Sequence, residues 1–502
     1  MNCLLNFLKK NWLISLLLLL SLALRLWQIS GYMTFLGDEG RDALVWLRMV
    51  RNGKFTLIGP QTSIGNMYLG PLYYYLMLPF FILFGLSPVG PAIGVALFGV
   101  ATVFLIWWAG REWFSEKAGL MAAFLYAVSP VVIIYSHSSW NPNVMPFFSL
   151  LTIYGIYQFW QREKFIWLPI IGITLSFCLQ SHYLGFLLIP LVVILQAVTF
   201  RNILRVKDTE RLKRFILLFI VCYLLFVILT LVPLIWFDLR HNFINGQAFY
   251  KFFSERQTTV NFKIYKAIPN LWPLWELMIT RLLAAKEIVF GKWLAVLFIL
   301  GLMIQGRVFP KKPILWLLSA WVLIGLLGMG LYKQHIYDHY FGFLFPAPFL
   351  LAGFLLEKAW AFREFRKLRE FGILGFLILA SYFSIKNSPL QYSPNYQMKK
   401  VQEVDRRIIQ ESGEKPFNFG LIARQNYEAG YEYFLEDWKA PLVRIEPQRA
   451  NQTITGQLFV VCEDSVCEPI NHPKAEIANF GWAKIDETWE FPWGVKLFKL
   501  IH

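Results

Sequence analysis

Long apolar stretches alternate with short polar ones over the first 386 residues of this 502-residue chain. A helix needs about 20 mainly apolar residues to cross a membrane, so the repeated stretches predict an α-helical polytopic membrane protein. About eleven transmembrane helices are expected, near residues 11–29, 91–109, 118–135, 144–160, 165–179, 185–200, 215–236, 292–306, 313–331, 341–356 and 371–385. Two long loops, about 30–90 and 237–291, fall on one side of the membrane in this arrangement.

One apolar segment does not fit this series. Residues 71–86 read PLYYYLMLPFFILFGL, which is short for a span and contains Pro79. If the segment crossed the membrane, every later basic loop would change sides. We therefore predict an interfacial or re-entrant helix, which is tolerated at membrane depth where protein or a cavity covers it.

The apolar runs end near residue 386, and the chain divides there into a transmembrane domain, 1–386, and a small α/β domain, 387–502. The pattern predicts a helix over 396–412 and strands over 417–423, 457–462 and 494–501. Cys462 and Cys467 lie in this domain. A local disulfide between them is expected in an oxidising compartment, and two free thiols are the alternative.

Composition and charge fix the class and the orientation. The chain is 57% hydrophobic and only 16% charged, and its net charge is +16. Six Lys or Arg residues lie between 201 and 214, in a predicted inner loop. In contrast, the three short outer loops, 136–143, 180–184 and 332–340, have Lys333 as their only Lys or Arg residue. The positive-inside rule then makes the N-terminus cytoplasmic and the C-terminal domain extracytoplasmic. Basic inner loops explain the charge, so no nucleic-acid partner is expected. The first apolar run lacks a small-residue cleavage site, which favours a retained anchor.

Polar residues gather on the predicted outer face. The sequence Gly37-Asp38-Glu39-Gly40 puts two adjacent carboxylates just beyond the first apolar run, where they cost desolvation energy unless they face water, a cation or a substrate. Twelve further positions join them. Six come from the first three outer segments, Arg41, Tyr68, Asn141, Asn143, His182 and Tyr183, and six from the last two, Arg240, His241, Lys333, His335, Asp338 and His339. We predict that they line a shared cavity. The residues expected to contact the substrate there are Arg41, Tyr68, Asn141, Asn143, His182, Tyr183, His241 and Asp338.

Each of these residues also has a structural interpretation. An interfacial His or Tyr can be a membrane anchor. The Asn141-Pro142-Asn143 turn could cap the next helix, Arg240 could pair with Asp238, and Asp38 could cap a helix that begins near Arg41. The sequence contains no GxxxxGK[ST], HExxH or GxSxG motif with a placed triad to suggest a soluble enzyme.

Several short motifs carry a family resemblance over roughly residues 10–360. They are the acidic pair, the PLYYY helix, Gly110-Arg111-Glu112-Trp113-Phe114 at an inner turn, and Ser129-Pro130 before the NPN turn. Together they resemble the GT-C membrane glycosyltransferases, in particular the family of protein O-mannosyltransferases and aminoarabinose transferases. The resemblance implies transfer of a sugar from a polyprenyl-phosphate donor to an acceptor protein, lipid or glycan outside the cytoplasm.

By this resemblance Asp38 matches the essential first-loop acid of the family and Glu39 its neighbour. The family carries a second acid in a Pro-Asp turn, and Asn143 stands there in this chain. It also carries His-Pro-Pro or Glu-Lys-Pro before the aromatic helix, and Leu69-Gly70-Pro71 stands there instead. These departures remove oxygen and nitrogen ligands that could hold a cation, so the resemblance does not settle whether a divalent metal is needed.

The chemistry of such a donor requires a base and a cation. We expect Asp38 to act as the general base on the acceptor hydroxyl, and Arg240, with Lys333, His335 or His339, to bind the leaving phosphate. A transporter or flippase is the main alternative; it usually shows polar residues near the bilayer midplane and repeated halves. A membrane-anchored sensor or assembly factor, and an oligosaccharide transferase or ligase, are further alternatives.

Overall fold

The computed structural model describes residues 11–62, 67–255, 260–261, 263–308, 312–361, 366–464 and 466–502. These residues belong to two compact units. Unit 1 comprises Met1–Trp27, Thr56–Pro79 and Pro91–Ser393. Unit 2 comprises Gln28–Phe55, Phe80–Gly90 and Pro394–His502. Unit 2 therefore contains, besides the predicted C-terminal domain, two segments that lie far earlier in the chain.

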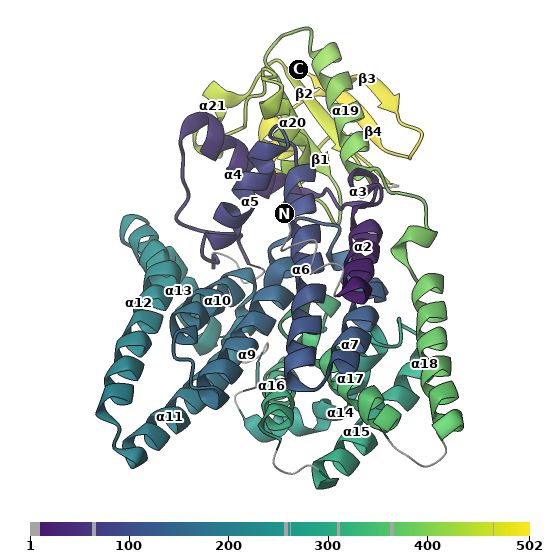
Figure 1. The fold of residues 1–502 in the computed structure, drawn as a ribbon. Coiled ribbons are helices and arrows are strands. Elements are labelled where there is room, and N and C mark those ends of the chain that lie inside the picture. The colour runs from purple at the N-terminus through teal and green to yellow at the C-terminus, as the bar shows by residue number, and fades with distance from the viewer. Residues whose placement is uncertain are drawn as a thin grey trace. The chain divides into compact units, whose positions relative to one another are not determined.

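Unit 1 is helical (Figure 1). Its α-helices are α2 (Trp12–Leu26), α7 (Glu116–Val128), α8 (Pro130–Tyr135), α9 (Met145–Gln161), α10 (Trp167–Ser181), α11 (Ile189–Val206), α12 (Thr209–Arg240), α13 (Ile244–Glu255), α14 (Ile268–Leu282), α15 (Ile288–Val308), α16 (Pro313–Gly330), α17 (Pro346–Ala361) and α18 (Arg366–Lys386). Short 3-10 helices are η1 (Asn141–Val144), η2 (Tyr183–Leu188), η3 (Ile264–Ala267), η4 (Asp338–Leu344) and η5 (Pro389–Gln391). Helices α5 (Leu72–Leu83) and α6 (Val89–Trp113) contribute residues to both units.

The predicted membrane segments are helical over most of their length, which confirms the helical membrane fold. Some of them are divided, among them 118–135 between α7 and α8, and 341–356 between η4 and α17. Within the described residues, five helices are long and apolar enough to cross a membrane, or six if Asp338–Leu344 and Pro346–Trp360 form one bent span. The count of about eleven crossings stays a prediction. Helix α5 contains Pro79, and its interfacial or re-entrant position also stays a prediction.

Small residues allow the helices of unit 1 to approach closely. Helix α10 packs against both α9 and α12, and α7 packs against α17. A Cβ atom at Gly172 would lie 2.3 Å from the carbonyl oxygen of Cys222, and one at Gly353 would lie 2.3 Å from that of Ala118. Glycine is needed at both positions, because lipid offers no hydrophobic drive and helices associate through such close packing.

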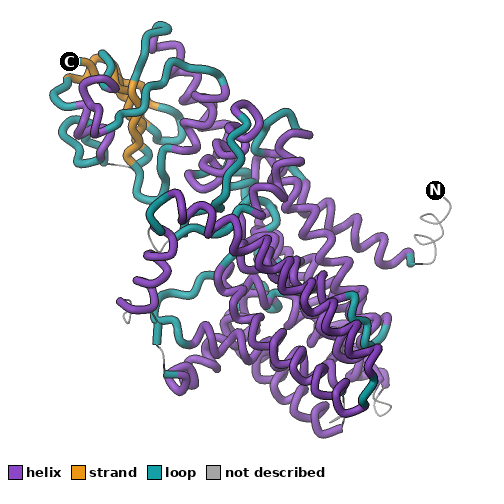
Figure 2. The backbone as a smooth tube through the Cα atoms, turned by 90° about the vertical axis from the view of Figure 1, so that its left-hand side faces the viewer, coloured by secondary structure: helices purple, strands orange, loops and turns teal. Residues whose placement is uncertain are grey.

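Unit 2 contains a four-stranded sheet built from β1 (Asn418–Ile422), β2 (Gln457–Cys462), β3 (Lys484–Glu490) and β4 (Lys496–Ile501). The strand order is β1-β2-β4-β3; β1 pairs with β2 in parallel, and β4 pairs antiparallel with β2 and β3. The strands are orange in Figure 2, and all four come from the part of the chain between Asn418 and Ile501. The predicted strands correspond to β1, β2 and β4, and the sequence analysis missed β3.

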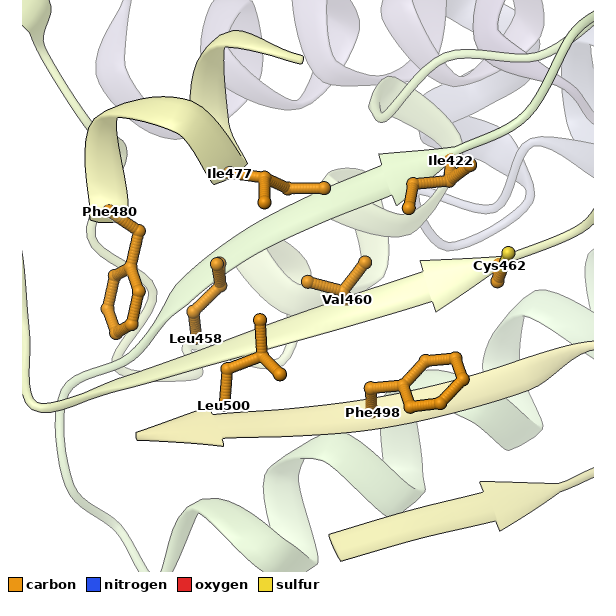
Figure 3. Packing of buried hydrophobic residues seen from close by; sticks show 8 residues of the cluster. All are labelled: Ile422, Leu458, Val460, Cys462, Ile477, Phe480, Phe498 and Leu500. Atoms are coloured by element: carbon orange, nitrogen blue, oxygen red, sulfur yellow. The ribbon is translucent and has the colours of Figure 1, made fainter. Parts of the chain in front are cut away.

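One cluster of the core of unit 2 lies on one face of this sheet. Strand β2 is buried over its whole length, and its side chains Leu458, Val460 and Cys462 point to the same cluster (Figure 3). Helix α22 (Ala475–Phe480) adds Ile477 and Phe480 from above the strands. Such a central strand reads as a continuous apolar run because both of its faces are covered.

The remaining helices of unit 2 are α3 (Ile29–Tyr32), α4 (Gly37–Asn52), α19 (Gln397–Ser412), α20 (Ala429–Asp437) and α21 (Ala450–Thr453), with the 3-10 helix η6 (Pro447–Arg449). Helix α19 confirms the predicted helix over 396–412. Helix α4 packs against α20, and a Cβ atom at Gly40 would lie 2.3 Å from the backbone nitrogen of Gly430. The predicted loop 30–90 therefore contains a helix that is fitted closely to the C-terminal segment.

The Sγ atoms of Cys462 and Cys467 are bonded in the structure, and their Cα atoms lie 6.2 Å apart. We predict that this disulfide forms in the cell and stabilises the fold of unit 2 by about 2 kcal/mol, because closing a short loop restricts the unfolded chain. Both cysteines fall in one tryptic peptide, and mass spectrometry of the unreduced protein is expected to find this peptide lighter by the mass of two hydrogen atoms than its dithiol form. Two free thiols in that experiment would contradict the prediction.

Candidate active site

The N-terminus of α4 carries the acidic pair of the sequence. Leu36 stands at the N-cap and offers no side-chain acceptor, so the first backbone N–H groups need other partners. The Leu36 N–H donates to Oε2 of Glu39 at 3.1 Å, and the Gly37 N–H donates to Oδ1 of Asn426 at 2.8 Å. Asp38 follows the cap inside the first turn. The idea that it caps a helix beginning near Arg41 is therefore wrong.

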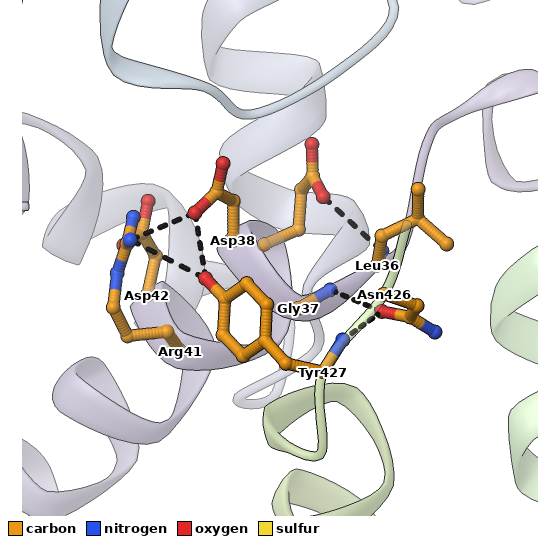
Figure 4. Close-up of polar contacts among 8 residues, drawn as sticks. Leu36, Gly37, Asp38, Arg41, Asp42, Asn426 and Tyr427 are labelled. Carbon is orange, nitrogen blue, oxygen red and sulfur yellow. Dashed lines mark hydrogen bonds and ion pairs between the residues drawn. The ribbon is translucent and has the colours of Figure 1, made fainter. Parts of the chain in front are cut away.

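Asp38 presents an exposed carboxylate with one oxygen already engaged. The side chain is 41% exposed. Its Oδ1 accepts hydrogen bonds from Nη1 of Arg41 at 2.8 Å and from the hydroxyl of Tyr427 at 2.6 Å (Figure 4). No residue within the described ranges bonds to Oδ2, which points away from both donors in Figure 4. The result is a carboxylate with one anchored oxygen and one accessible oxygen.

Arg41 joins the exposed carboxylate to a buried one. Its Nε and Nη2 atoms lie 2.9 and 2.8 Å from Oδ1 of Asp42, whose side chain is fully buried. The same guanidinium donates to Asp38 through Nη1. A planar guanidinium that is held by two carboxylates has little freedom to turn. Arg41 thus fixes the rotamer of Asp38, and its predicted contact with substrate stays a prediction.

Glu39 has a different environment from its neighbour. It is only 5% exposed, and burial raises its pKa to about 7, with smaller contributions from the charges of Asp38 and Asp42. Backbone N–H groups of Leu36 and Glu39 act in the opposite direction. The geometry gives Glu39 a capping role at α4 and leaves Asp38 as the accessible acid.

Tyr427 is a site residue that the sequence analysis missed. It lies in the loop before α20, next to Asn426, and contacts Asp38 across 389 positions of sequence. Burial raises the pKa of the Tyr427 phenol, so its hydroxyl stays protonated and donates to the carboxylate. No motif marks it, because its partner lies in another segment of the chain.

His182 and His339 of unit 1 belong to one aromatic cluster, at the start of η2 and of η4. The ring centroid of His339 lies 4.6 Å from that of Trp140, 4.7 Å from that of Tyr340 and 5.8 Å from that of His182. His182 also lies 5.1 Å from Tyr183. The structure therefore brings together three of the predicted residues, His182, Tyr183 and His339, from two separate loops.

Neighbouring polar residues support this cluster. Nδ2 of Asn141 donates to the carbonyl of Ser181 at 2.6 Å, which ties the NPN turn to the end of α10. Nδ2 of Asn143 donates to the carbonyl of Ser138 at 2.9 Å. Asp338 pairs with Nε of Arg281 at 2.9 Å, a cation that the sequence analysis did not single out. Asn141, Asn143 and Asp338 thus have clear structural partners, and their contact with substrate stays a prediction.

A second group lies at the C-terminal end of α12. The rings of Tyr68 and His241 both contact Phe237, at centroid distances of 6.0 and 4.1 Å. Arg240 is exposed, and its guanidinium lies 4.9 Å from the ring of Trp236.

Two other predicted phosphate ligands lie in the loop after α16. Lys333 and His335 are exposed there, and the ring of His335 lies 4.7 Å from that of Tyr337. The phosphate-binding role of both stays a prediction. Among the residues that the structure describes, no group of three His, Cys, Asp or Glu side chains could hold a metal ion.

Comparison with known structures shows the same architecture in glycosyltransferases. ArnT from Cupriavidus metallidurans, bound to undecaprenyl phosphate, has a TM-score of 0.62 and 12% identity, and the match covers 97% of each chain. The archaeal oligosaccharyltransferase AglB from Archaeoglobus fulgidus, in complex with an inhibitory peptide and a dolichol-phosphate, has a TM-score of 0.53 and 15% identity over 91% of this chain and 70% of that one. This chain has the GT-C fold of polytopic membrane glycosyltransferases.

The other comparisons agree with this GT-C fold. The arabinofuranosyltransferase AftD from Mycobacteria has a TM-score of 0.55 and 12% identity over 98% of this chain and 40% of that one. The family model of dolichyl-phosphate-mannose-protein mannosyltransferases matches residues 69–236. No curated protein sequence matches the chain. The resemblance seen in the short motifs is therefore confirmed at the level of the GT-C class.

The buried Glu39 predicts how stability depends on pH. Its pKa rises from 4.5 to about 7 on folding, so between these values the folded chain holds a proton that the unfolded chain has lost. Stability therefore falls as pH rises through this range, by about 3 kcal/mol at most, and the loss remains above pH 7. Glu39→Gln keeps the oxygen that accepts from Leu36 and removes the charge. We expect the variant to be more stable than the wild type at pH 8.

Thermal unfolding of the purified protein at pH 5 and pH 8 tests this expectation. The difference in Tm between Glu39→Gln and wild type should be small at pH 5 and larger at pH 8. A difference that is the same at both pH values would rule out titration of Glu39 as its cause.

Proposed function

We propose that this protein transfers a sugar from a polyprenyl-phosphate-linked donor to an acceptor on the extracytoplasmic face of the membrane. The observation that carries the proposal is the carboxylate of Asp38, exposed at the first turn of α4 with Oδ1 anchored and Oδ2 accessible. The GT-C fold supports the reaction class, and the polyprenyl phosphates bound to ArnT and AglB support the donor class.

The reaction needs little chemical activation by the protein. The sugar is bound to a phosphate that leaves as a stable anion, and the acceptor hydroxyl must lose its proton as it attacks. Oδ2 of Asp38 takes this proton, while Arg41 and Tyr427 hold Oδ1 and keep the carboxylate in one orientation. The new bond joins the acceptor oxygen to the anomeric carbon, and the bond from that carbon to the phosphate oxygen breaks.

The leaving phosphate needs a cation. Arg240 is our first candidate, because it is exposed at the end of α12 and its guanidinium can form a bidentate contact with a phosphate. The alternatives are Lys333 and His335 in the loop before η4, and His339 inside η4. Burial lowers the pKa of His339 to about 4, so its imidazole would bind the phosphate as a neutral hydrogen-bond donor. The rings around His182, Tyr183, His339 and His241 offer flat surfaces against which a sugar can stack.

The assay begins with identification of the product. Cells with and without this chain are compared by mass analysis of their glycolipids and glycoproteins, and the glycan that depends on the chain is taken as the product. Lipid extracts of the deficient cells then supply the donor for rate measurements in membranes that contain the full-length protein. This design identifies a hexosyl or pentosyl product, and a protein, lipid or glycan acceptor, without assuming either. If no glycan depends on the chain, the proposed function is wrong.

Asp38→Asn is the decisive variant. It preserves the size of the side chain and an oxygen that accepts from Arg41 and Tyr427, but it removes the base. Loss of a general base typically lowers the rate by about 10²–10⁴-fold. We expect Asp38→Asn protein to insert in membranes at the wild-type level and to lose transfer by this factor. Transfer near the wild-type rate would show that Asp38 is not the base, and Glu39→Gln would then be assayed.

Arg240→Lys tests whether Arg240 binds the leaving phosphate. A lysine keeps the positive charge but cannot reproduce a bidentate contact. Loss of one hydrogen bond between charged groups predicts a KM for the donor that is about ten-fold higher, with little change in Tm. Lys251→Arg is a matched control on the neighbouring helix α13, where the charge is kept and no phosphate role is proposed. If the kinetics of Arg240→Lys are unchanged, phosphate binding would be assigned to residues 333–339 instead.

A further inference from the structure

We infer that the C-terminal domain is part of the catalytic apparatus, and that its Tyr427 is a positioning residue for Asp38. This inference rests on the proposed function and deepens it, because it assigns a role in sugar transfer to a segment outside the apolar helices. Tyr427 acts through the carboxylate that it holds.

The contact of Tyr427 with Asp38 is short and shared. The hydroxyl donates to Oδ1 of Asp38 at 2.6 Å and accepts from Nη1 of Arg41 at 3.3 Å. Nη1 of Arg41 also donates to the same Oδ1 at 2.8 Å. The three groups form a closed triangle in which Oδ1 is saturated with donors (Figure 4). A proton from an acceptor must then go to Oδ2, so the triangle selects which oxygen acts as the base.

Asn426 holds this tyrosine at the helix start. Oδ1 of Asn426 accepts from the backbone N–H groups of Gly37 and Tyr427, at 2.8 and 2.9 Å. Its Nδ2 donates to Glu463, whose Oε1 also accepts from the hydroxyl of Tyr431 at 2.7 Å. The loop is thus tied to α4 on one side and to the end of β2 and α20 on the other. Such a network fixes a loop side chain far better than one contact does.

Gly37 makes room for the ring. A Cβ atom at this position would lie 2.3 Å from Cδ1 of Tyr427, well inside a van der Waals contact. The aromatic ring therefore lies against the backbone of the residue that precedes Asp38. A glycine at the first position of a helix has no packing value of its own, so this contact explains its presence.

The same two elements also share contacts that do not touch Asp38. Nε and Nη2 of Arg48 lie 3.0 and 2.8 Å from the two carboxylate oxygens of Glu436, a bidentate pair between α4 and α20. Arg48 lies ten residues after Asp38 on α4, almost three turns along the helix, and bonds to neither Asp38 nor Tyr427. Removal of this pair weakens the attachment of α4 to α20 and leaves the triangle in place. Arg48→Gln is therefore the matched control.

The test compares Tyr427→Phe with Arg48→Gln in full-length protein. Membranes with each variant receive the lipid extract of the deficient cells at increasing concentrations, and initial rates give the apparent kcat and KM. We expect Tyr427→Phe to lower kcat roughly ten-fold and to leave KM for the donor unchanged, since it removes one hydrogen bond to a charged group. Arg48→Gln should lower Tm and leave kcat unchanged.

The outcomes separate the two levels of the proposal. If wild type transfers sugar, Asp38→Asn does not and Tyr427→Phe transfers at the wild-type rate, then the role of Tyr427 is overturned and the function stands. The role is also overturned if Tyr427→Phe and Arg48→Gln lower kcat and Tm in parallel, because the contact is then structural. If Tyr427→Phe fails to insert, Asn426→Ala provides the second variant, and it must lower kcat without raising KM.

Discussion

The start of helix α4 imposes the constraint on which the candidate site depends. The first backbone N–H groups of a helix have no partner inside it, and a leucine at the N-cap supplies none. Two acceptors satisfy them here, the carboxylate of Glu39 from within the helix and the amide of Asn426 from the C-terminal domain. The contacts that satisfy the backbone therefore bury Glu39, leave Asp38 exposed and bring Tyr427 next to Asp38.

Two adjacent acids acquire different chemistry from this arrangement. Successive helical residues point about 100° apart, so Glu39 turns back to the cap while Asp38 faces outward. Burial makes Glu39 a poor anion, whereas Arg41 and Tyr427 supply donors to the charged form of Asp38. Pairs of carboxyl groups in contrasting environments are a recurrent way to separate roles in enzyme sites.

The sequence predicted the parts of the fold that depend on apolar length. Runs such as 91–109 and 215–236 are helical because a membrane span must satisfy its own backbone. Strands β1, β2 and β4 were also found. Strand β3, with the sequence KIDETWE, was missed because it is an exposed edge strand with no apolar pattern. For α4, the sequence offered only a helix that begins near Arg41, as part of the structural interpretation of Asp38. The helix begins at Gly37 instead, and its partner α20 lies more than 370 residues later in the chain.

The sequence also predicted only part of the candidate site. The acidic pair was visible because charge beside an apolar run is costly, and the grouping of His182, Tyr183 and His339 followed from loops on one face. Asn426 and Tyr427 carried no signal, since an Asn-Tyr pair in a polar loop is ordinary. Their importance comes only from the hydrogen bonds that they make after folding.

The long separation between Asp38 and Tyr427 also sets an order of events during synthesis. Ribosomes add about 5–20 residues per second, so the 389 residues between the two partners take about 20 to 80 s to make. Throughout that time Asp38 has Arg41 but lacks the tyrosine, and the Gly37 N–H lacks Asn426. Formation of the complete site is thus delayed until the segment that contains Asn426 and Tyr427 has been made and has folded. A nascent chain that stalls before residue 426 would carry the acid without the partners that orient it.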